Sequence, residues 1–313
     1  MRKLNRTGEK GLKLIRDDRD RSQKIRMVVS DMDGSFLDGH GRVSPANAGA
    51  VRALGQAGIQ FAVCTGRNQE AARKALCEAG ITCGMVAMNG AAIYRGDGTL
   101  LREQVLSGDK AGEILKALKP WKDSLIIQLV TGDGSFIIAR EQIFRSFFMT
   151  RIFPKADRSQ EEEEALFRAY KRVTAEEFLK LRQVCYKIET LSEDTGLIRE
   201  IRKPLESIED ISVAASFPTN WEITQAKATK DQGLKEYADS AGCALEEIMA
   251  VGDGDNDRAM LSLPLGWTVA MGNSGEDIKD VAKVITGTNQ EDGFAQAVWA
   301  LLEARDEKIK PGR

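Results

Sequence analysis

Histidine is scarce in this sequence, and long apolar runs and a marked excess of one charge are absent. Its 313 residues include a single histidine, His40, and 45 lysines and arginines stand against 47 aspartates and glutamates, a formal net charge of −2. This balance creates no global positive field for nucleic acid or for an anionic membrane surface. A small molecule is therefore the expected partner. We expect His40 to be a polar loop residue, with a place at the rim of a pocket as the alternative.

No apolar run approaches the roughly 20 residues of a membrane-spanning helix, and the N-terminal stretch lacks the continuous apolar core of a signal peptide. We therefore expect a cytoplasmic protein that makes no membrane contact. The first residues mix both signs of charge without sustained periodicity, which predicts a mobile extension over residues 1–24. Residues 307–313 are predicted to be a C-terminal tail.

The cysteines form no C-x-x-C pair and have no histidine beside them, which argues against a zinc site and a disulfide framework. We expect reduced, mostly buried thiols. Cys64 lies in a predicted strand and is interpreted as a core residue rather than a nucleophile. The five cysteines are Cys64, Cys77, Cys83, Cys185 and Cys243.

What the chain does contain is an alternation of short apolar runs and helical segments. The runs are rich in β-branched residues and predict strands at residues 25–30, 59–64, 83–88, 247–253 and 267–271. Helices are expected between them; the first follows the N-cap pair Ser44-Pro45 and ends at Gly58. Strands that alternate with helices of this length predict a doubly wound α/β fold with a parallel, Rossmann-like sheet.

The middle of the chain has a different character. The runs LIIQLVT and SFIIAR, separated by a GDG turn, predict an antiparallel hairpin, and further helices and strands follow. We therefore predict an inserted α+β domain over residues 93–218, within a core made of residues 25–92 and 219–306. As a cap, this domain is expected to close over the pocket, exclude bulk water and select the substrate.

Polar residues gather where the predicted parallel strands end, and those ends meet at one edge of a sheet. Several carboxylates at close range stay ionised only if a cation neutralises them. Because Mg²⁺ prefers oxygen ligands and keeps positions for water and phosphate, a magnesium site for phosphoryl transfer is predicted. The residues concerned, strand by strand, are Asp31, Asp33 and Ser35; Thr65, Gly66 and Arg67; Asn89 and Gly90; and Asp253, Asn256 and Asp257.

Calcium in an EF-hand loop is excluded. Such a loop needs glycine at its sixth and glutamate at its twelfth position. A loop starting at the first acidic cluster would place Phe36 and Arg42 there, and one starting at the second would place Arg258 and Pro264. Two further acids, Asp38 and Asp255, are interpreted as solvated loop residues.

The ordered motifs resemble the haloacid dehalogenase-like hydrolase superfamily, and more closely its Cof-type subfamily with an inserted type IIB cap. They are DMDGS at 31–35, TGR at 65–67, Lys230, and GDGDND at 252–257. Three further segments also resemble this family: Asn89-Gly90-Ala91, MGN at 271–273 and TGTNQEDG at 286–293. The resemblance covers residues 25–305, and Ser35 departs from it because threonine is more usual there.

This resemblance implies a role for each matched residue. Asp31 would be the nucleophile and Asp33 the general acid and base. Mg²⁺ would be held by Asp31, Asp253 and the backbone carbonyl of Asp33, with Asp257 binding it directly or through water. Phosphate would be bound by Thr65, Gly66, Lys230, Ser35 and Asn256, the last also orienting its loop; Lys227 is the rival lysine, and Arg67, Asn89 and Gly90 are candidates for substrate contacts.

The expected activity is therefore hydrolysis of a small phosphorylated metabolite, such as a sugar phosphate, a nucleotide or a cofactor phosphate. It would proceed through an aspartyl-phosphate intermediate with Mg²⁺ as cofactor. Two alternatives stay open. A sugar phosphomutase shares the D-x-D start but shields the intermediate from water. A non-catalytic sensor of magnesium and phosphate would keep Asp31 phosphorylated, although it would not need Asp33.

Overall fold

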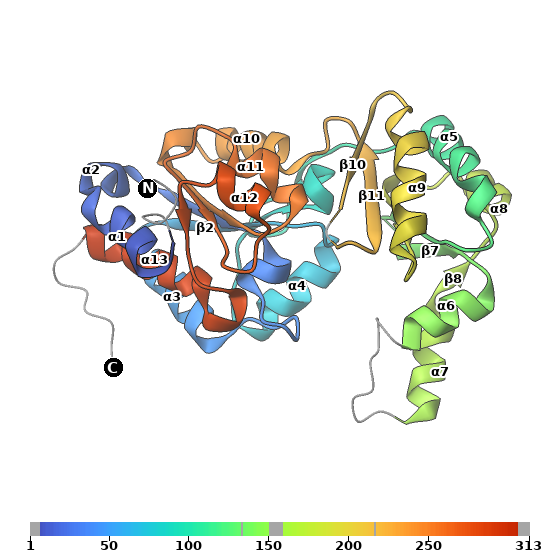
Figure 1. The fold of residues 1–313 in the computed structure, drawn as a ribbon, viewed down its shortest axis with the longest axis horizontal. Coiled ribbons are helices and arrows are strands. Elements are labelled where there is room, and N and C mark those ends of the chain that lie inside the picture. The colour runs from blue at the N-terminus through green and yellow to red at the C-terminus, as the bar shows by residue number, and fades with distance from the viewer. Residues whose placement is uncertain (1–6, 133, 150–158, 216, 306–313) are drawn as a thin grey trace. The chain divides into compact units, whose positions relative to one another are not determined.

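The computed structural model describes residues 7–132, 134–149, 159–215 and 217–305, which fall into two units (Figure 1). Unit 1 runs up to Glu103 and resumes at Thr229, and unit 2 comprises Gln104–Ala228. Each unit has its own sheet and its own apolar core.

The sheet of unit 1 has eight strands in the order β14-β13-β12-β1-β2-β3-β4-β5. The six strands from β14 to β3 in this order are parallel to one another. At the end of the sheet, β4 pairs antiparallel with β3, and β5 pairs antiparallel with β4. The predicted parallel α/β core is thus confirmed. The strands are β1 (Met27–Ser30), β2 (Gln60–Cys64), β3 (Gly84–Ala87), β4 (Ala92–Tyr94), β5 (Leu100–Glu103), β12 (Ile248–Gly252), β13 (Trp267–Ala270) and β14 (Val284–Ile285).

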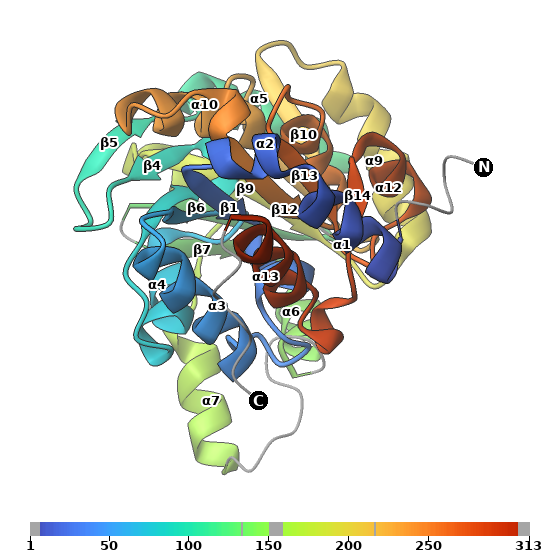
Figure 2. The same ribbon diagram turned by 90° about the vertical axis from the view of Figure 1, so that its left-hand side faces the viewer.

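Helices cover both faces of this sheet, with α10, α11 and α12 on one face and α3, α4 and α13 on the other (Figures 1 and 2). The first face buries aliphatic side chains of the strands against α10 and α11. On the second face Phe36, Phe61 and Phe294 pack with ring centroids 4.9–5.6 Å apart. The helices are α3 (Pro45–Gln56), α4 (Gln69–Glu78), α10 (Lys230–Ser240), α11 (Arg258–Leu261), α12 (Glu276–Val281) and α13 (Gly293–Arg305).

The signals that predicted the first crossover helix have the expected geometry. The hydroxyl of Ser44 accepts a hydrogen bond from the amide of Asn47, and Pro45 opens α3. Gly58 follows the helix with φ +71°, a left-handed conformation that glycine adopts without a Cβ clash.

The prediction of a mobile extension over residues 1–24 is wrong for the residues that the structure describes there. These form α1 (Gly8–Asp17) and α2 (Arg19–Lys24), which pack on α13. Leu12 and Ile15 are buried, and the buried hydroxyl of Ser22 accepts a hydrogen bond from the indole of Trp267. The segment is helical because Leu12 and Ile15 lie on one helical face that a partner surface buries, and the sequence analysis missed this amphipathic spacing.

Unit 2 is built on six strands in the order β10-β11-β9-β6-β7-β8. The predicted hairpin is confirmed, since β6 and β7 pair antiparallel from Ile127↔Ile138 to Thr131↔Gly134. The strands are β6 (Ile126–Thr131), β7 (Gly134–Ile138), β8 (Lys171–Arg172), β9 (Cys185–Leu191), β10 (Ile211–Ala214) and β11 (Asn220–Gln225), and the helices are α5 (Gly108–Leu118), α6 (Glu141–Phe147), α7 (Gln160–Ala169), α8 (Ala175–Leu181) and α9 (Thr195–Glu206).

The boundaries between the units differ from the predicted 93–218. After β3 the chain turns back at Asn89 and Gly90 and adds β4 and β5 to the first sheet, so unit 2 begins about ten residues later. At the other end β11 pairs with β9 and β10, which moves residues 220–225 from the predicted core into unit 2. The predicted tail 307–313 lies outside the described residues.

Within the described part of the chain, no helix combines the length and the apolar character that crossing a membrane requires.

Candidate active site

The site begins at the carboxyl end of the central strand β1. Asp31 follows β1, its amide donates to the carbonyl of Val251 at 2.9 Å, and its side chain is almost entirely buried. The turn η1 (Met32–Phe36) then reverses the chain, with Gly34 at φ +81°. A Cβ on Gly34 would collide with the carboxylate of Asp253, so this position is restricted to glycine by the backbone and by the site together.

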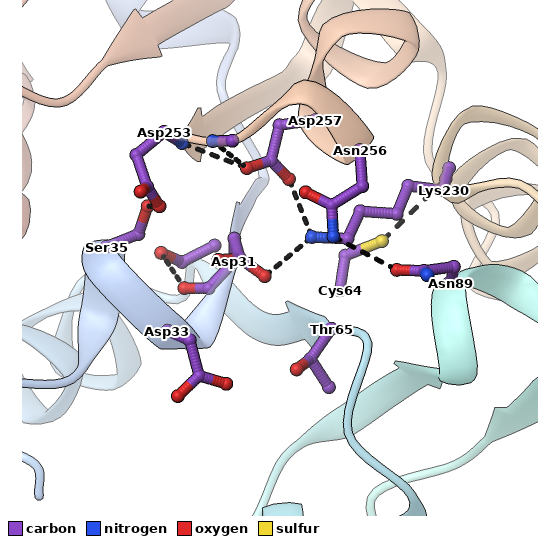
Figure 3. A network of polar contacts seen from close by, with 12 residues as sticks. Asp31, Asp33, Ser35, Cys64, Thr65, Asn89, Lys230, Asp253, Asn256 and Asp257 are labelled. Atoms are coloured by element: carbon purple, nitrogen blue, oxygen red, sulfur yellow. Dashed lines mark hydrogen bonds and ion pairs between the residues drawn. The ribbon is translucent and has the colours of Figure 1, made fainter. Parts of the chain in front are cut away.

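Lys230, the first residue of α10, joins two of the predicted acids (Figure 3). Its Nζ donates to Oδ1 of Asp31 at 2.6 Å and to Oδ1 of Asp257 at 2.7 Å, and its side chain is fully buried. Burial alone would lower the pKa of Lys230, but the charges of Asp257 and Asp31 raise it well above its ordinary value. Lys227, the rival lysine, is exposed and belongs to unit 2. Lys230 is therefore the lysine at this cluster.

The second acidic loop is fixed by its own backbone. Oδ2 of Asp257 accepts hydrogen bonds from the amides of Asp253 and Gly254 at 2.9 and 3.0 Å. The carboxylate of Asp253 accepts a bond from the Ser35 hydroxyl at 2.8 Å. Burial, and then the charge of Asp257, raise the pKa of Asp253 to about 7, although the bond from Ser35 lowers it.

Ser35 itself is fully buried, and its only hydroxyl proton points to Asp253. This geometry gives its side chain a role in orienting Asp253. It does not favour the predicted contact between that side chain and phosphate.

Asp31, Asp253 and Asp257 each offer one carboxylate oxygen, and these three oxygens lie within 4.8 Å of one another. Burial raises the pKa of Asp31 well above its ordinary value; Lys230 opposes this effect, and Asp257 and Asp253 add to it. Such mutual repulsion is what a divalent cation relieves, and the donor set consists of the hard oxygen ligands that Mg²⁺ takes. The described residues therefore fit a magnesium ion. The predicted contribution of the Asp33 carbonyl stays a prediction.

Asp33 forms a contact that the sequence analysis missed. Its carboxylate is bound on both oxygens by Arg67, with Nε to Oδ2 at 2.7 Å and Nη2 to Oδ1 at 2.6 Å. A two-bond guanidinium–carboxylate pair is strong and fixes the orientation of both groups. Each residue was singled out by its motif, but the two stand 34 positions apart and no periodic signal in the sequence pairs them.

The ends of β2 and β3 contribute the other predicted residues. Thr65 is buried, and its hydroxyl accepts a bond from the amide of Arg67 at 3.1 Å, while Gly66 lies between them. Asn89 has φ +55°, and its Oδ1 accepts a bond from the side chain of Asn256 at 3.2 Å. A Cβ on Gly90 would collide with the carbonyl of Thr229, so the glycine lets this turn approach the start of α10 closely.

Asn273 is a residue that the sequence analysis left out of the site. Its Nδ2 donates to the carbonyl of Gly34 at 2.9 Å and approaches Oδ2 of Asp253 at 3.4 Å, and its Oδ1 accepts from the amide of Asn289 at 3.0 Å. It thus ties three loops together behind a predicted metal ligand. The sequence feature that could have identified Asn273 was the MGN segment at 271–273. The sequence analysis noted its resemblance to the family but assigned it no role.

The residues interpreted as bystanders lie away from the acidic cluster or have other partners. His40 and Asp255 are exposed, and Asp38 accepts hydrogen bonds from the amides of His40 and Arg42 within its own loop. Cys64 is buried; its thiol contacts the carbonyl of Lys230 at 3.7 Å, and burial raises its pKa far above the ordinary value. A thiol in that state is a poor nucleophile.

Comparison with known families and proteins shows what the chain is similar to. Residues 28–298 match the model of the haloacid dehalogenase-like hydrolases. The chain is similar to phosphatase YwpJ of Bacillus subtilis strain 168, with 30% identity over 288 residues that cover 89% of this chain and all of that protein. It is also similar to 5-amino-6-(5-phospho-D-ribitylamino)uracil phosphatase YcsE of the same strain, with 26% identity over 88% of this chain and 96% of the relative.

Solved structures show the same fold. A haloacid dehalogenase-like hydrolase from B. subtilis superposes with a TM-score of 0.74 and 27% identity, covering 88% of this chain and 99% of that one. The phosphatase BT1666 from Bacteroides thetaiotaomicron superposes with a TM-score of 0.69 and 23% identity, covering 89% and 96%. The second similarity concerns the fold alone.

Proposed function

The chain belongs to the haloacid dehalogenase-like hydrolases as a phosphatase of the Cof type, and we propose that it hydrolyses a small phosphorylated metabolite with Mg²⁺ through an aspartyl-phosphate intermediate. One observation carries the proposal. Asp31, buried at the end of β1, has Lys230 at 2.6 Å and two further carboxylates beside it, while Asp33 stands two residues on. Such an arrangement can bind the electrophilic phosphoryl group of a substrate and place the nucleophile Asp31 beside it.

Asp31, Asp253 and Asp257 would hold the magnesium ion. When bound, the ion would neutralise charge on the phosphate oxygens and so favour attack by an anionic nucleophile. Lys230 would offset the negative charge that spreads over the same oxygens in the transition state. The predicted phosphate contacts of Thr65, Gly66 and Asn256 stay predictions.

The first half-reaction is a transfer to Asp31. One carboxylate oxygen of Asp31 attacks phosphorus in line, the bond from phosphorus to the substrate oxygen breaks, and Asp33 donates a proton to that departing oxygen. In the second half-reaction water attacks the same phosphorus, the bond from phosphorus to the Asp31 oxygen breaks, and Asp33 takes a proton from the water. Inorganic phosphate leaves, and both aspartates return to their starting states.

The contact between Arg67 and Asp33 affects the step at which Asp33 can act as an acid or as a base. It binds both oxygens of Asp33, an arrangement suited to the ionised carboxylate that accepts a proton from water. To donate a proton to the departing oxygen, Asp33 has to exchange a bond with Arg67 for one with the substrate.

The substrate class rests on similarity. A relative with 26% identity carries in its name a phosphorylated ribitylamino-uracil, a small metabolite with one phosphoryl group. We propose a substrate of that general kind for this chain, without a choice among sugar, nucleotide and cofactor phosphates. The substrate-selecting role of unit 2 as a cap stays a prediction.

The test is release of inorganic phosphate from p-nitrophenyl phosphate and from a panel of sugar, nucleotide and vitamin phosphates, with Mg²⁺ or with EDTA. Asp31→Asn is expected to abolish release and Asp33→Asn to reduce it by about 10²–10⁴-fold, the usual contribution of a general acid and base. Asp255→Asn is the matched control, because Asp255 lies exposed in the same acidic loop, and it is expected to keep full activity.

Three results would overturn the proposal. Release that does not need Mg²⁺ would exclude the metal-assisted reaction. Transfer that requires a bisphosphate activator and yields no free phosphate would identify a phosphomutase. A stable phosphate on Asp31 of the unaltered protein, without turnover, would identify a sensor.

A further inference from the structure

Unit 2 contains a cavity that the proposed reaction does not use. It lies between α5, α8 and the β6–β7 pair and has a volume of about 500 Å³. The helices α5 and α8 lie side by side (Figure 1). All of its lining residues belong to unit 2. Its size falls within the ~300–1,000 Å³ of pockets that bind small molecules.

The floor of the cavity is apolar. Leu118 and Ile127 lie at its base as members of the core of unit 2, and Leu179 of α8 borders it with 37% of its surface exposed. An exposed leucine beside a concave apolar surface leaves hydrophobic area in water that a ligand would cover. The other apolar lining residues are Leu115, Ile138 and Val173.

A glycine keeps the cavity open. Gly112 stands in the middle of α5, where glycine costs about 1 kcal/mol of helix stability relative to alanine. A Cβ built there would meet Cδ1 of Leu179 at 3.6 Å, which is ordinary contact rather than a clash. Close packing therefore does not require the glycine, but a larger side chain at this position would fill the space between the two helices.

The rim of the cavity is basic. Lys116, Lys119 and Lys122 are exposed on one side, and no hydrogen bond or ion pair of these three ammonium groups occurs among the described residues. Arg140 is engaged by Asp123, with Nε to Oδ1 at 2.9 Å. With Glu176 as the other acidic lining residue, the rim carries an excess of two positive charges, whereas the whole chain has a net charge of −2.

From this combination we infer that the cavity between α5 and α8 binds a small amphipathic anion: an apolar body covers Leu118, Ile127 and Leu179, and a single anionic head group meets Lys116, Lys119 and Lys122. A medium-chain carboxylate has this chemistry. Burial of the ligand's apolar chain and of the exposed part of Leu179 supplies the affinity, and the lysines supply the preference for a negative head group. The site is separate from the Asp31 cluster and does not depend on the reaction proposed there.

The test uses the full-length protein with methyl-labelled isoleucine, leucine and valine. Sodium decanoate is titrated below the concentration at which it forms micelles, and decan-1-ol serves as the uncharged analogue. Decanoate is expected to shift the methyl signals of Leu118, Ile127 and Leu179 in a saturable manner. Decanol is expected to bind at least several-fold more weakly, because it lacks the charge that the lysines would meet.

Two variants separate the contributions. Combined Lys116→Gln, Lys119→Gln and Lys122→Gln is expected to weaken decanoate binding by about tenfold, as three partly screened charge contacts together would. Lys203→Gln, a lysine of unit 2 that does not line the cavity, is expected to leave it unchanged. Gly112→Leu is expected to abolish binding while every lysine stays in place.

The inference is overturned if decanoate leaves these methyl signals unmoved or shifts signals elsewhere instead. It is equally overturned if decanol binds as well as decanoate, or if Gly112→Leu or the triple lysine variant binds decanoate as the unaltered protein does. Each variant is checked for an unchanged methyl spectrum outside the cavity, so that a folding defect is not mistaken for lost binding.

Discussion

Two of the three clustered carboxylates share one lysine at the centre of the site. Lys230 donates to Asp31 and Asp257, whereas Asp253 accepts a bond from the neutral hydroxyl of Ser35. Without a bound cation the cluster therefore holds more negative charge than it can neutralise, which is why the pKa of Asp253 is raised to about 7 by burial and by Asp257.

This raised pKa predicts an unusual pH dependence of the metal-free protein. An aspartate has a pKa of about 4 in the unfolded chain. Between that pH and about 7 the folded protein therefore binds more protons than the unfolded chain, and its free energy of unfolding falls as the pH rises through this window. We expect the EDTA-treated protein to be about 2–4 kcal/mol less stable at pH 8 than at pH 5 as a result.

Urea unfolding at the two pH values, with EDTA and with Mg²⁺, measures this effect. Mg²⁺ should restore stability at pH 8, because it binds the ionised carboxylates. Asp253→Asn should reduce the pH dependence. A metal-free protein that is as stable at pH 8 as at pH 5 would show that the cluster is not strained by its own charge.

Asn273 illustrates how a residue behind a ligand acts. Its side chain donates to the carbonyl of Gly34 and approaches Asp253 at 3.4 Å, so Asn273→Ala frees a predicted metal ligand to move. We expect the Mg²⁺ concentration for half-maximal activity to rise by about tenfold, the lower end for residues that orient metal ligands. The maximal rate at saturating Mg²⁺ should change much less.

The control is Asp18→Ala, which removes the side-chain N-cap of α2, a helix that packs on α13. That change should cost about 1 kcal/mol of stability and leave the Mg²⁺ requirement as it was. If both variants shift the requirement equally, Asn273 has only a structural role.

At the scale of elements, the turn η1 couples the backbone to the site. An added Cβ on Gly34, at φ +81°, would meet Asp253, whereas one on Gly58, which follows α3 at φ +71°, would meet nothing within 4 Å. Alanine at either position carries the same left-handed strain of about 1–2 kcal/mol. Only at Gly34 would it also displace Asp253.

We therefore expect Gly58→Ala to lose about 1 kcal/mol of stability with phosphatase activity retained. Gly34→Ala should lose at least twice as much stability and nearly all activity. Urea unfolding and phosphate release, measured side by side, separate the two contributions. Equal losses of activity in both variants would mean that strain alone, not the contact with Asp253, determines the outcome.

The elements that position the site could be predicted because local signals agree there. Each parallel strand is a short apolar run that ends in polar residues, and Ser44 and Gly58 mark the ends of α3. Pairings between distant residues were not predictable, since the contact between Asp33 and Arg67 depends on how two strand ends meet.

The remaining misses also depend on distant partners. The helix α1 buries Leu12 and Ile15 only because α13 covers them, and a ten-residue helix is marginal on its own. The strand β11 was assigned to the wrong unit because its apolar pattern does not say which sheet it joins.

At the scale of the whole molecule, residues from the two ends of the described chain are held together within unit 1. Nη1 of Arg305, the last residue of α13, donates to the carbonyls of Ser22, Gln23 and Ile25 at 3.2, 2.9 and 2.6 Å. These carbonyls lie at the end of α2, where helix backbones lack internal partners and a cation is favourable.

Arg305→Met should therefore lower the free energy of unfolding by about 2 kcal/mol, within the range for hydrogen bonds to a charged group. The phosphatase rate should stay unchanged, because Arg305 takes no part in the acidic cluster. Arg258→Met, which removes an exposed pair with Asp277, should cost less than about 1 kcal/mol and serves as the control. An equal cost for both variants would show that the bonds to α2 add nothing.

The packing of α1 and α2 on α13 also bears on how the protein is made. During synthesis the N-terminal residues leave the ribosome first. The helices α1 and α2 therefore emerge some 270 residues before α13, the helix that covers them. Unit 2 is encoded by one continuous stretch and can acquire its core as it emerges, whereas unit 1 has to wait for its last strands. Leu12 and Ile15, which are buried in the folded protein, therefore stay without the cover of α13 through most of translation.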